Sequence, residues 1–168
     1  MVKYNFGSGE RPKKWYINVD YYVKADIKYD LNKYPYKFAK NNSAEEIVCE
    51  RLIGMINNIP RFLQECHRIL KPNGRLIILD HHFSNVSSIQ SVIRIHRFGY
   101  RSFNPKFFYI PILNKFETIE IKMEFMSRFF NIFKFIPIIY EYTILKYLFP
   151  CNNITFVLKK RDERKKRV

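Results

Sequence analysis

The sequence predicts an α/β fold. Segments with strand-like alternation or continuous aliphatic character alternate along the chain with segments of helical periodicity. The first strand-like segment, residues 2–6, runs directly into Gly7-Ser8-Gly9. Residues 58–79 then combine a capped helix, a Pro-Gly turn and an aliphatic strand, which together form the second half of a βαβ unit.

Four strands are expected in the N-terminal part of the chain. The expected ranges are 2–6, 16–20, 25–31 and 45–49, with a loop over residues 32–43, which contain Pro35. The fourth range has helix as its alternative, because no helix breaker occurs between Glu45 and Gly54.

The helix that follows is the clearest element of the chain. Asn58 is placed to cap it, Pro60 suits its first turn, and apolar residues recur at helical spacing up to Leu70. The turn at 71–74 is expected to end this helix, and the aliphatic run at 75–79 reads as a buried central strand.

The C-terminal part is less regular. The expected elements are a short helix within 85–95, a loop at 97–105, a strand at 116–125, a helix over 129–148 kinked at Pro137, and a last strand at 153–158. The two closing strands are suited to antiparallel pairing.

Composition indicates a folded protein with a strong positive charge. A length of 168 residues corresponds to one domain, and an apolar content of 47% argues against disorder. A net charge of +15 would attract phosphate or an anionic membrane surface. We assign residues 1–160 to a single domain and residues 161–168 to a basic tail, which we expect to be a solvated end.

The cysteines and the hydropathy pattern bear on location. Cys49, Cys66 and Cys151 are widely spaced and form no CxxC pair, which favours reduced thiols and predicts no metal site. The apolar stretch at 129–149 is interrupted by charges and Pro137, unlike a membrane span. No leader pattern opens the sequence, and we expect a cytoplasmic monomer or homodimer without a transmembrane segment.

The glycine pair and the acid that follows it are typical of nucleotide sites. Gly7 and Gly9 would let the backbone approach a ligand, because glycine has no side chain and tolerates positive φ. Asp20, at the end of the second strand, is placed to accept hydrogen bonds from ribose hydroxyls. A tight turn between two strands is the alternative.

Four segments in this order resemble the class I S-adenosylmethionine-dependent methyltransferases, in their small "type 11" branch. They are Tyr4-Asn5-Phe6-Gly7-Ser8-Gly9, Tyr16-Ile17-Asn18-Val19-Asp20, Tyr29-Asp30-Leu31 and residues 62–76 with the turn Arg-Ile-Leu-Lys-Pro-Asn-Gly. The resemblance covers residues 2–83 well and the remainder more loosely. It implies a Rossmann-like three-layer sandwich with few helices, sheet order 3-2-1-4-5-7-6 with strand 7 antiparallel, and S-adenosyl-L-methionine as cofactor.

The resemblance also implies the cofactor-binding residues. They are Asn5, Phe6, Gly7, Ser8, Gly9, Asp20, Asp30 and Cys49. In this assignment the glycines face the methionine part, Asp20 the ribose and Asp30 the adenine. The residues around Cys49 to Arg51 lie beside the transferring methyl group.

On the acceptor side, histidines are the candidates. His82 follows the fifth strand and is the candidate catalytic base, since methyl transfer often requires one base and histidine titrates near neutral pH. His81, His96 and Arg101 are the candidates for substrate contact. An ordinary loop or surface role is the alternative for each of these residues.

Two features depart from the family pattern. The connection between Gly9 and the second strand is too short for the usual helix, and Ile53-Gly54-Met55 stands where Leu-Glu-His is usual. Loss of that polar pair makes a catalytically degenerate relative, acting by binding a partner, one alternative function.

We predict a methyltransferase that acts on a small molecule, a sugar or a lipid-linked glycan. An RNA methyltransferase or a nucleic-acid-binding protein is the other alternative, for which the positive charge is the argument. The Phe-rich stretch at 125–149 is expected to be core, with peripheral membrane contact or a dimer interface as its alternatives.

Overall fold

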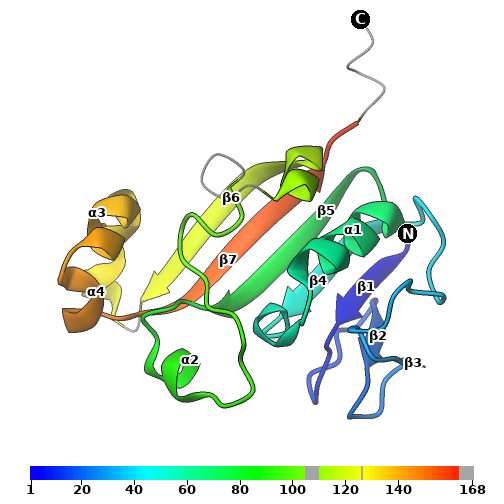
Figure 1. The fold of residues 1–168 in the computed structure, drawn as a ribbon, viewed down its shortest axis with the longest axis horizontal. Coiled ribbons are helices and arrows are strands. Elements are labelled where there is room, and N and C mark those ends of the chain that lie inside the picture. The colour runs from blue at the N-terminus through cyan, green and yellow to red at the C-terminus, as the bar shows by residue number, and fades with distance from the viewer. Residues whose placement is uncertain (105–109, 126, 163–168) are drawn as a thin grey trace, which may run out of the picture.

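The computed structural model describes residues 1–104, 110–125 and 127–162, which form an α/β fold around one sheet (Figure 1). Seven strands pair in the order β3-β2-β1-β4-β5-β7-β6. Their bounds are β1 (Lys3–Phe6), β2 (Ile17–Asp20), β3 (Ile27–Lys28), β4 (Ala44–Glu50), β5 (Leu70–His81), β6 (Phe116–Phe125) and β7 (Cys151–Lys160). This order confirms the predicted 3-2-1-4-5-7-6.

Strand direction creates one functional edge. β1 to β5 pair in parallel, whereas β7 runs antiparallel to both β5 and β6, as predicted for the closing strands. The carboxyl ends of the five parallel strands therefore meet at the same side of the sheet, which we call the carboxyl edge. The segment that joins the end of β6 to the start of β7 also lies at this edge, because β6 runs in the same direction as the parallel strands.

The main helix forms as the sequence predicts. α1 (Ile59–Ile69) begins after Asn58, whose side chain accepts a hydrogen bond from the Arg61 amide at 3.0 Å. Its apolar face is buried against the sheet, and Phe62 meets Phe6 of β1 edge-on. One cap and one amphipathic face thus fix this helix.

The other helices are short. They are α2 (Val86–Gln90), α3 (Pro137–Tyr142), α4 (Leu145–Leu148) and the 3₁₀ helices η1 (Ile53–Met55), η2 (Pro111–Lys115) and η3 (Arg128–Phe135). The predicted single kinked helix over 129–148 is wrong, because the chain divides there into η3, α3 and α4. Pro137 begins α3 instead of kinking a longer helix. A proline is tolerated in the first turn because the amide hydrogen that it lacks would have no acceptor within the helix.

Three further predictions need correction. The third strand is limited to Ile27–Lys28 instead of 25–31, and the helical alternative for 45–55 is wrong, because β4 occupies residues 44–50. The expected turn at 71–74 lies within β5 as a bulge: Ala44 pairs with Leu70 and Glu46 with Arg75, so the intervening residues loop out of register.

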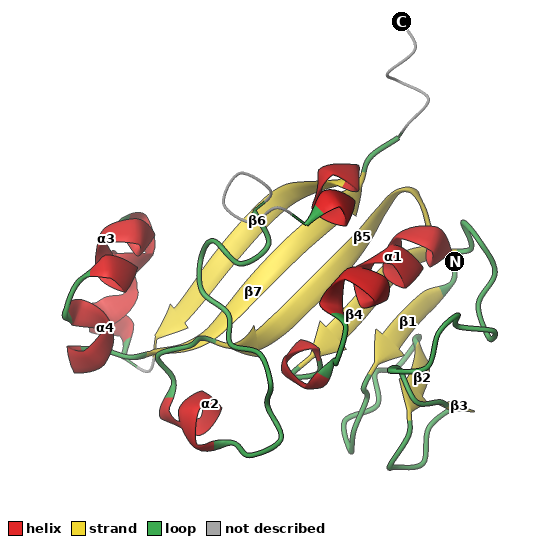
Figure 2. Ribbon diagram, in the orientation of Figure 1, coloured by secondary structure: helices red, strands yellow, loops and turns green. Residues whose placement is uncertain are grey.

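The helices that pack on the centre of the sheet lie on one of its faces, so the described chain has two layers, one of strands and one of helices (Figure 2). The connections at 7–16 and 21–26 contain no helix, and for this reason the third layer of the predicted sandwich is missing. Loop residues take part of its place: the Tyr16 hydroxyl donates to Glu46, and the Lys13 ammonium pairs with Glu50 at 2.6 Å.

The core lies between the sheet and the α1 layer. The long connection at 29–43 packs there without forming a helix, with Tyr36 fully buried and its ring edge-on to Phe6 at 5.7 Å. The Tyr36 hydroxyl donates to the Leu31 carbonyl at 2.7 Å, which closes this loop on itself. Aromatic side chains therefore supply the packing that a crossover helix would otherwise give.

Candidate functional site

A cleft of about 1160 Å³ opens at the carboxyl edge of β1, β2 and β4. Its walls come from the glycine loop after β1, the residues after β2, the end of β4 with η1, and Ile93 from the segment after α2. Ligands of open α/β sheets bind at this position, where the strand order reverses. The cleft is therefore the candidate cofactor site.

Both glycines of the loop have left-handed backbones, with φ of +65° at Gly7 and +53° at Gly9. A Cβ at Gly7 would lie 2.8 Å from Leu52 Cδ1, so close packing requires glycine there. A Cβ at Gly9 would meet no atom within 4 Å, although Gly9 lines the cleft. Gly9 therefore leaves room for a ligand, which a side chain would fill.

Asp20 holds this loop in place. Its Oδ2 accepts a hydrogen bond from the Gly9 amide and its Oδ1 one from the Tyr22 amide, both at 2.8 Å. Oδ1 also accepts from the Val23 amide at 3.3 Å. Because a carboxylate oxygen has two acceptor sites, Oδ2 is the oxygen that keeps capacity for a ligand hydroxyl. Asp20 lines the cleft, and its placement fits the predicted ribose contact.

Ser8 lies between the two glycines and lines the cleft. Its Oγ is buried and has no hydrogen-bond partner within the described residues. Buried hydroxyls are usually paired, so an orphan at the wall of a cleft is a contact point for a ligand. The orphaned hydroxyl and the open space at Gly9 both fit a bound nucleoside cofactor.

The remaining predicted cofactor residues divide into two groups. Asn5 and Asp30 line the cleft, where Asn5 donates to Asn18 and Asp30 accepts from the Asn32 amide, each at 2.9 Å. Phe6 and Cys49 are fully buried in the core and are not among the lining residues. Burial raises the pKa of the Cys49 thiol well above its usual range.

Within the predicted range 49–51, the two residues after Cys49 line the cleft. Glu50 and Arg51 line the cleft at the end of β4, and Arg51 has a positive φ of 55°. Strand alternation explains the difference, because Cys49 shares the core face with Ile47, whereas Glu50 points to the opposite face. The same alternation could have been used to separate these residues from sequence.

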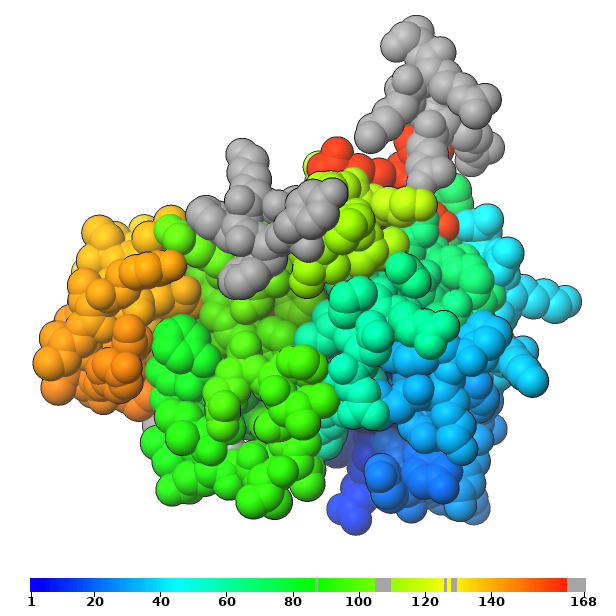
Figure 3. All heavy atoms as spheres, viewed as in Figure 1, coloured from blue at the N-terminus to red at the C-terminus, as the bar shows by residue number. Residues whose placement is uncertain are grey.

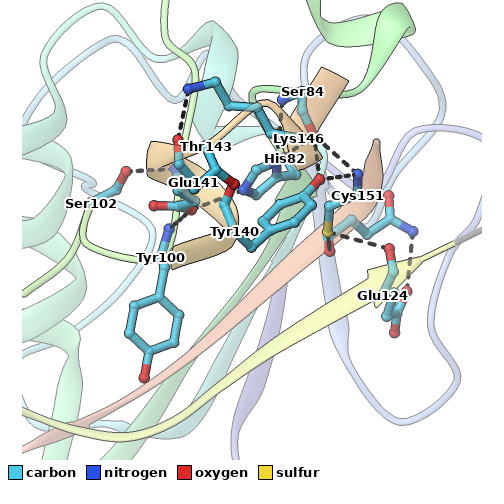
Figure 4. Close-up of polar contacts among 12 residues, drawn as sticks. His82, Ser84, Tyr100, Ser102, Glu124, Tyr140, Glu141, Thr143, Lys146 and Cys151 are labelled. Atoms are coloured by element: carbon cyan, nitrogen blue, oxygen red, sulfur yellow. Dashed lines mark hydrogen bonds and ion pairs between the residues drawn. The ribbon is translucent and has the colours of Figure 1, made fainter. Parts of the chain in front are cut away.

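His82 belongs to a buried polar network (Figure 4). Its Nδ1 lies 2.8 Å from Ser84 Oγ and its Nε2 2.9 Å from Glu141 Oε1, and the ring is fully buried. Tyr140 joins the network, donating its hydroxyl to the Phe149 carbonyl and accepting from the Cys151 amide. His82 thus ties α3 to the end of β5 and is not among the residues that line the cleft.

The three predicted substrate residues are not brought together. His81 follows Leu79 on the same face of β5, and Leu79 lines the cleft; burial, then Arg94 and Arg51, lower the pKa of His81. His96 lines a separate hollow of about 420 Å³. Arg101 donates to the Tyr142 hydroxyl at 3.1 Å and stacks on its ring.

A buried ion pair that the sequence did not reveal orders the wall beside η1. Asp80 is fully buried, pairs with the Arg94 guanidinium and accepts from the Gly54 amide at 3.0 Å. The Gly54 carbonyl in turn accepts from the Ile95 amide at 2.8 Å. Arg94 crosses directly over Gly54, where a Cβ would lie 2.5 Å from its Nη1. Gly54 therefore makes room for Arg94.

Comparison with known proteins decides the fold family. A family model described as "Methyltransferase domain" matches residues 11–78. The chain has the fold of a class I methyltransferase. Among solved structures, an S-adenosylmethionine-dependent methyltransferase from Mesorhizobium loti has a TM-score of 0.62 at 10% identity, with 95% of this chain and 90% of that chain covered.

Two further structures show the same methyltransferase fold. One from Archaeoglobus fulgidus gives a TM-score of 0.61 at 14% identity, covering 95% of this chain and 86% of that one. A putative methyltransferase from Haloferax volcanii, in complex with the Trm112 activator, gives 0.58 at 12%, covering 96% and 83%. No curated protein matches the sequence.

These matches confirm the predicted resemblance and support S-adenosylmethionine as the cofactor. Within the described residues, no cluster of His, Cys, Asp and Glu could hold a metal ion. None of the helices in the same part of the chain has the length and apolar character needed to cross a bilayer.

Proposed function

We propose that this chain is an S-adenosylmethionine-dependent methyltransferase with its cofactor in the cleft at the carboxyl edge. The observation that carries the proposal is the glycine loop itself. Ser8 Oγ is buried beside the cleft without a partner in the described chain, and the space opposite Gly9 is open. A bound ligand explains both features, whereas a turn that only connects two strands requires neither of them.

Different residues of the chain would bind different parts of the cofactor. Asp20 would accept a hydrogen bond from a ribose hydroxyl at Oδ2 while continuing to hold the Gly9 and Tyr22 amides. Asp30 would lie by the adenine, and Glu50 and Arg51 by the reacting end. When bound, S-adenosylmethionine supplies an electrophilic methyl group on a positively charged sulfur.

Alignment is the protein's main contribution to such a transfer. Arg94 and Asp80 fix the turn at Gly54, and the Gly54 carbonyl fixes the segment that brings Ile93 to the cleft. The segment after β4 is therefore ordered although the polar pair that is usual there is absent. The absence of that pair therefore gives weaker support to a degenerate relative than the sequence suggests.

Calorimetric titration with S-adenosylmethionine and S-adenosylhomocysteine tests cofactor binding. Ser8→Ala should weaken both affinities by about 2- to 10-fold, the worth of one neutral hydrogen bond, without lowering the melting temperature. Ser43→Ala is the matched control, because its hydroxyl donates to the Lys40 carbonyl outside the cleft. An unchanged affinity in Ser8→Ala would contradict the assigned contact.

Gly9→Val is the stronger variant. A valine would fill the open space and strain a backbone with φ of +53°, so we expect binding to be lost. Because the strain also costs stability, folding is checked by circular dichroism. A folded wild type that binds neither ligand would overturn the proposal.

For the acceptor, we propose a small molecule, a sugar or a lipid-linked glycan. The cleft is wide, and the sheet face beside it has no helix to close it in the described chain. Transfer of a labelled methyl group to members of such an acceptor panel is the test. Cofactor binding without transfer to any acceptor would favour the degenerate relative.

A further inference from the structure

The described surface carries an unusual concentration of exposed apolar side chains at the carboxyl edge. They lie on two segments, residues 86–95 with α2 and residues 132–148 with η3, α3 and α4, which we call the apolar patch. The most exposed members are Val92 (97%), Phe135 (76%), Tyr147 (73%), Tyr142 (69%), Ile144 (66%) and Ile93 (65%). Contact between apolar side chains and water costs free energy, so a surface of this kind indicates a binding partner.

The two segments belong to one continuous surface (Figure 3). The Tyr100 amide donates to Glu141 of α3, and the Arg101 guanidinium stacks 4.9 Å from the Tyr142 ring. Arg97 connects the same loop to α2 through the Ile89 carbonyl. The buried His82–Glu141 pair holds α3 against the end of β5, so the patch has a fixed position on the fold.

The charges around the patch are of one sign. Residues 86–104 contain no Asp or Glu, and Glu141, the one acid within 127–149, is buried in the His82 network. Lys134 and Lys146 each lie 5.0 Å from the ring of the following aromatic residue, Phe135 and Tyr147. Cations beside exposed aromatic rings match the headgroup region of a bilayer, where apolar bodies enter the interface and charges stay in water.

We propose that the apolar patch docks the protein on an anionic membrane surface. A net charge of +15 complements anionic lipid, and an apolar surface rimmed by cations lies in the interface without crossing it. A second copy of the chain is a poorer occupant, because two such surfaces would bring the basic residues of both copies together.

Docking would orient the cleft as well. The patch and the cleft share the carboxyl edge, and Ile93 belongs to both. A docked molecule would therefore present its cleft to the lipid surface, which favours the lipid-linked glycan among the proposed acceptors. This last step rests on the proposed function, whereas membrane binding does not.

Co-sedimentation of the full chain with vesicles tests the proposal. Vesicles of phosphatidylcholine alone are compared with vesicles that also contain phosphatidylglycerol, and only the latter should bind strongly at low salt. Phe135→Glu and Ile139→Glu should each lower the partition coefficient about tenfold, because each removes one buried apolar anchor. Lys134→Glu should act in the same direction by charge alone.

The matched control is Ile119→Glu on β6. Ile119 is 52% exposed and Ile139 is 55% exposed. The two substitutions therefore make the same chemical change at similar exposure and differ only in their position on the surface. All these variants keep the basic tail, and a loss confined to the patch variants cannot come from the tail. Melting curves establish that each variant is folded.

Three results would overturn the proposal. They are no sedimentation of the wild type with phosphatidylglycerol vesicles, an equal loss in Ile119→Glu, and a dimer in solution that Ile139→Glu dissociates while vesicles do not bind. Cofactor binding is measured separately, so failure of membrane docking leaves the proposed function untouched.

Discussion

Gly54 shows how one residue can change meaning between sequence and structure. In the family pattern it replaces a polar residue, and by helix propensity it weakens a helix. In the fold it provides the space through which the Arg94 guanidinium reaches the buried Asp80. A glycine that indicates degeneration by resemblance is thus part of a working ion pair.

A double-mutant cycle measures this coupling. Gly54→Ala should lower the free energy of unfolding by about 1–3 kcal/mol, because the added methyl group displaces Arg94 from Asp80. In an Arg94→Ala background the same substitution should cost less than about 1 kcal/mol, since the nearest remaining atom is the His96 carbonyl oxygen at 3.3 Å. Additive effects in urea denaturation would contradict the packing role.

The pH dependence of stability should contain a contribution from His81. Its pKa is lowered from 6.5 in the folded state, first by burial and then by Arg94 and Arg51. The unfolded state therefore binds the proton more readily, and stability decreases as the pH is lowered from 6.5 towards the folded pKa. His81→Gln should reduce that decrease. An identical pH profile in the variant would contradict this assignment.

At the scale of elements, α1 is held at both ends by side chains. Asn58 caps its amino end, and Lys160, the last residue of β7, reaches its carboxyl end. The Lys160 ammonium donates to the carbonyls of Leu70 and His67 at 2.8 and 2.7 Å. A lysine at the border of the expected basic tail is thus a buried helix cap.

Lys160→Met should destabilise this helix more than the neighbouring substitution Lys159→Met. It keeps most of the side-chain stem but leaves buried carbonyls unpaired, so we expect a loss of about 2–4 kcal/mol in the free energy of unfolding. Lys159→Met, one position earlier, is the control and should change stability by less than about 0.5 kcal/mol. Equal effects in thermal melts would contradict the cap.

At the scale of the whole molecule, the net charge has an effect on binding that is separate from the effect of the fold. The net charge of +15 should give RNA affinity through phosphate contacts, which release counterions. We expect that affinity to fall at least about tenfold between roughly 50 and 200 mM salt, as measured by gel shift. Binding that withstands salt and depends on RNA sequence would instead support the nucleic-acid alternative.

Periodicity and local signals made much of the fold predictable. Capped amphipathic helices and aliphatic runs are local patterns, so α1 and the seven strands could be located from sequence, and the resemblance supplied their order. The break of residues 129–148 into three helices was not predictable, because tertiary contacts of Tyr140 and Glu141 decide it. The short connection after Gly9 already indicated that one helix was absent, but the predicted sandwich kept three layers, and only the structure showed that one layer is missing.

The sequence by itself determined where the strands, the glycine loop and its supporting acid lie along the chain, because each depends on neighbours within a few residues or on alternation along a strand. Only the tertiary structure decided which side chains reach the cleft. His82 and Cys49 lie inside the fold, and Glu50 and Ile93 lie at the wall, because burial depends on segments that are far apart in sequence. Local sequence therefore determines which helices and strands form, and packing between distant elements determines which side chains make up the site.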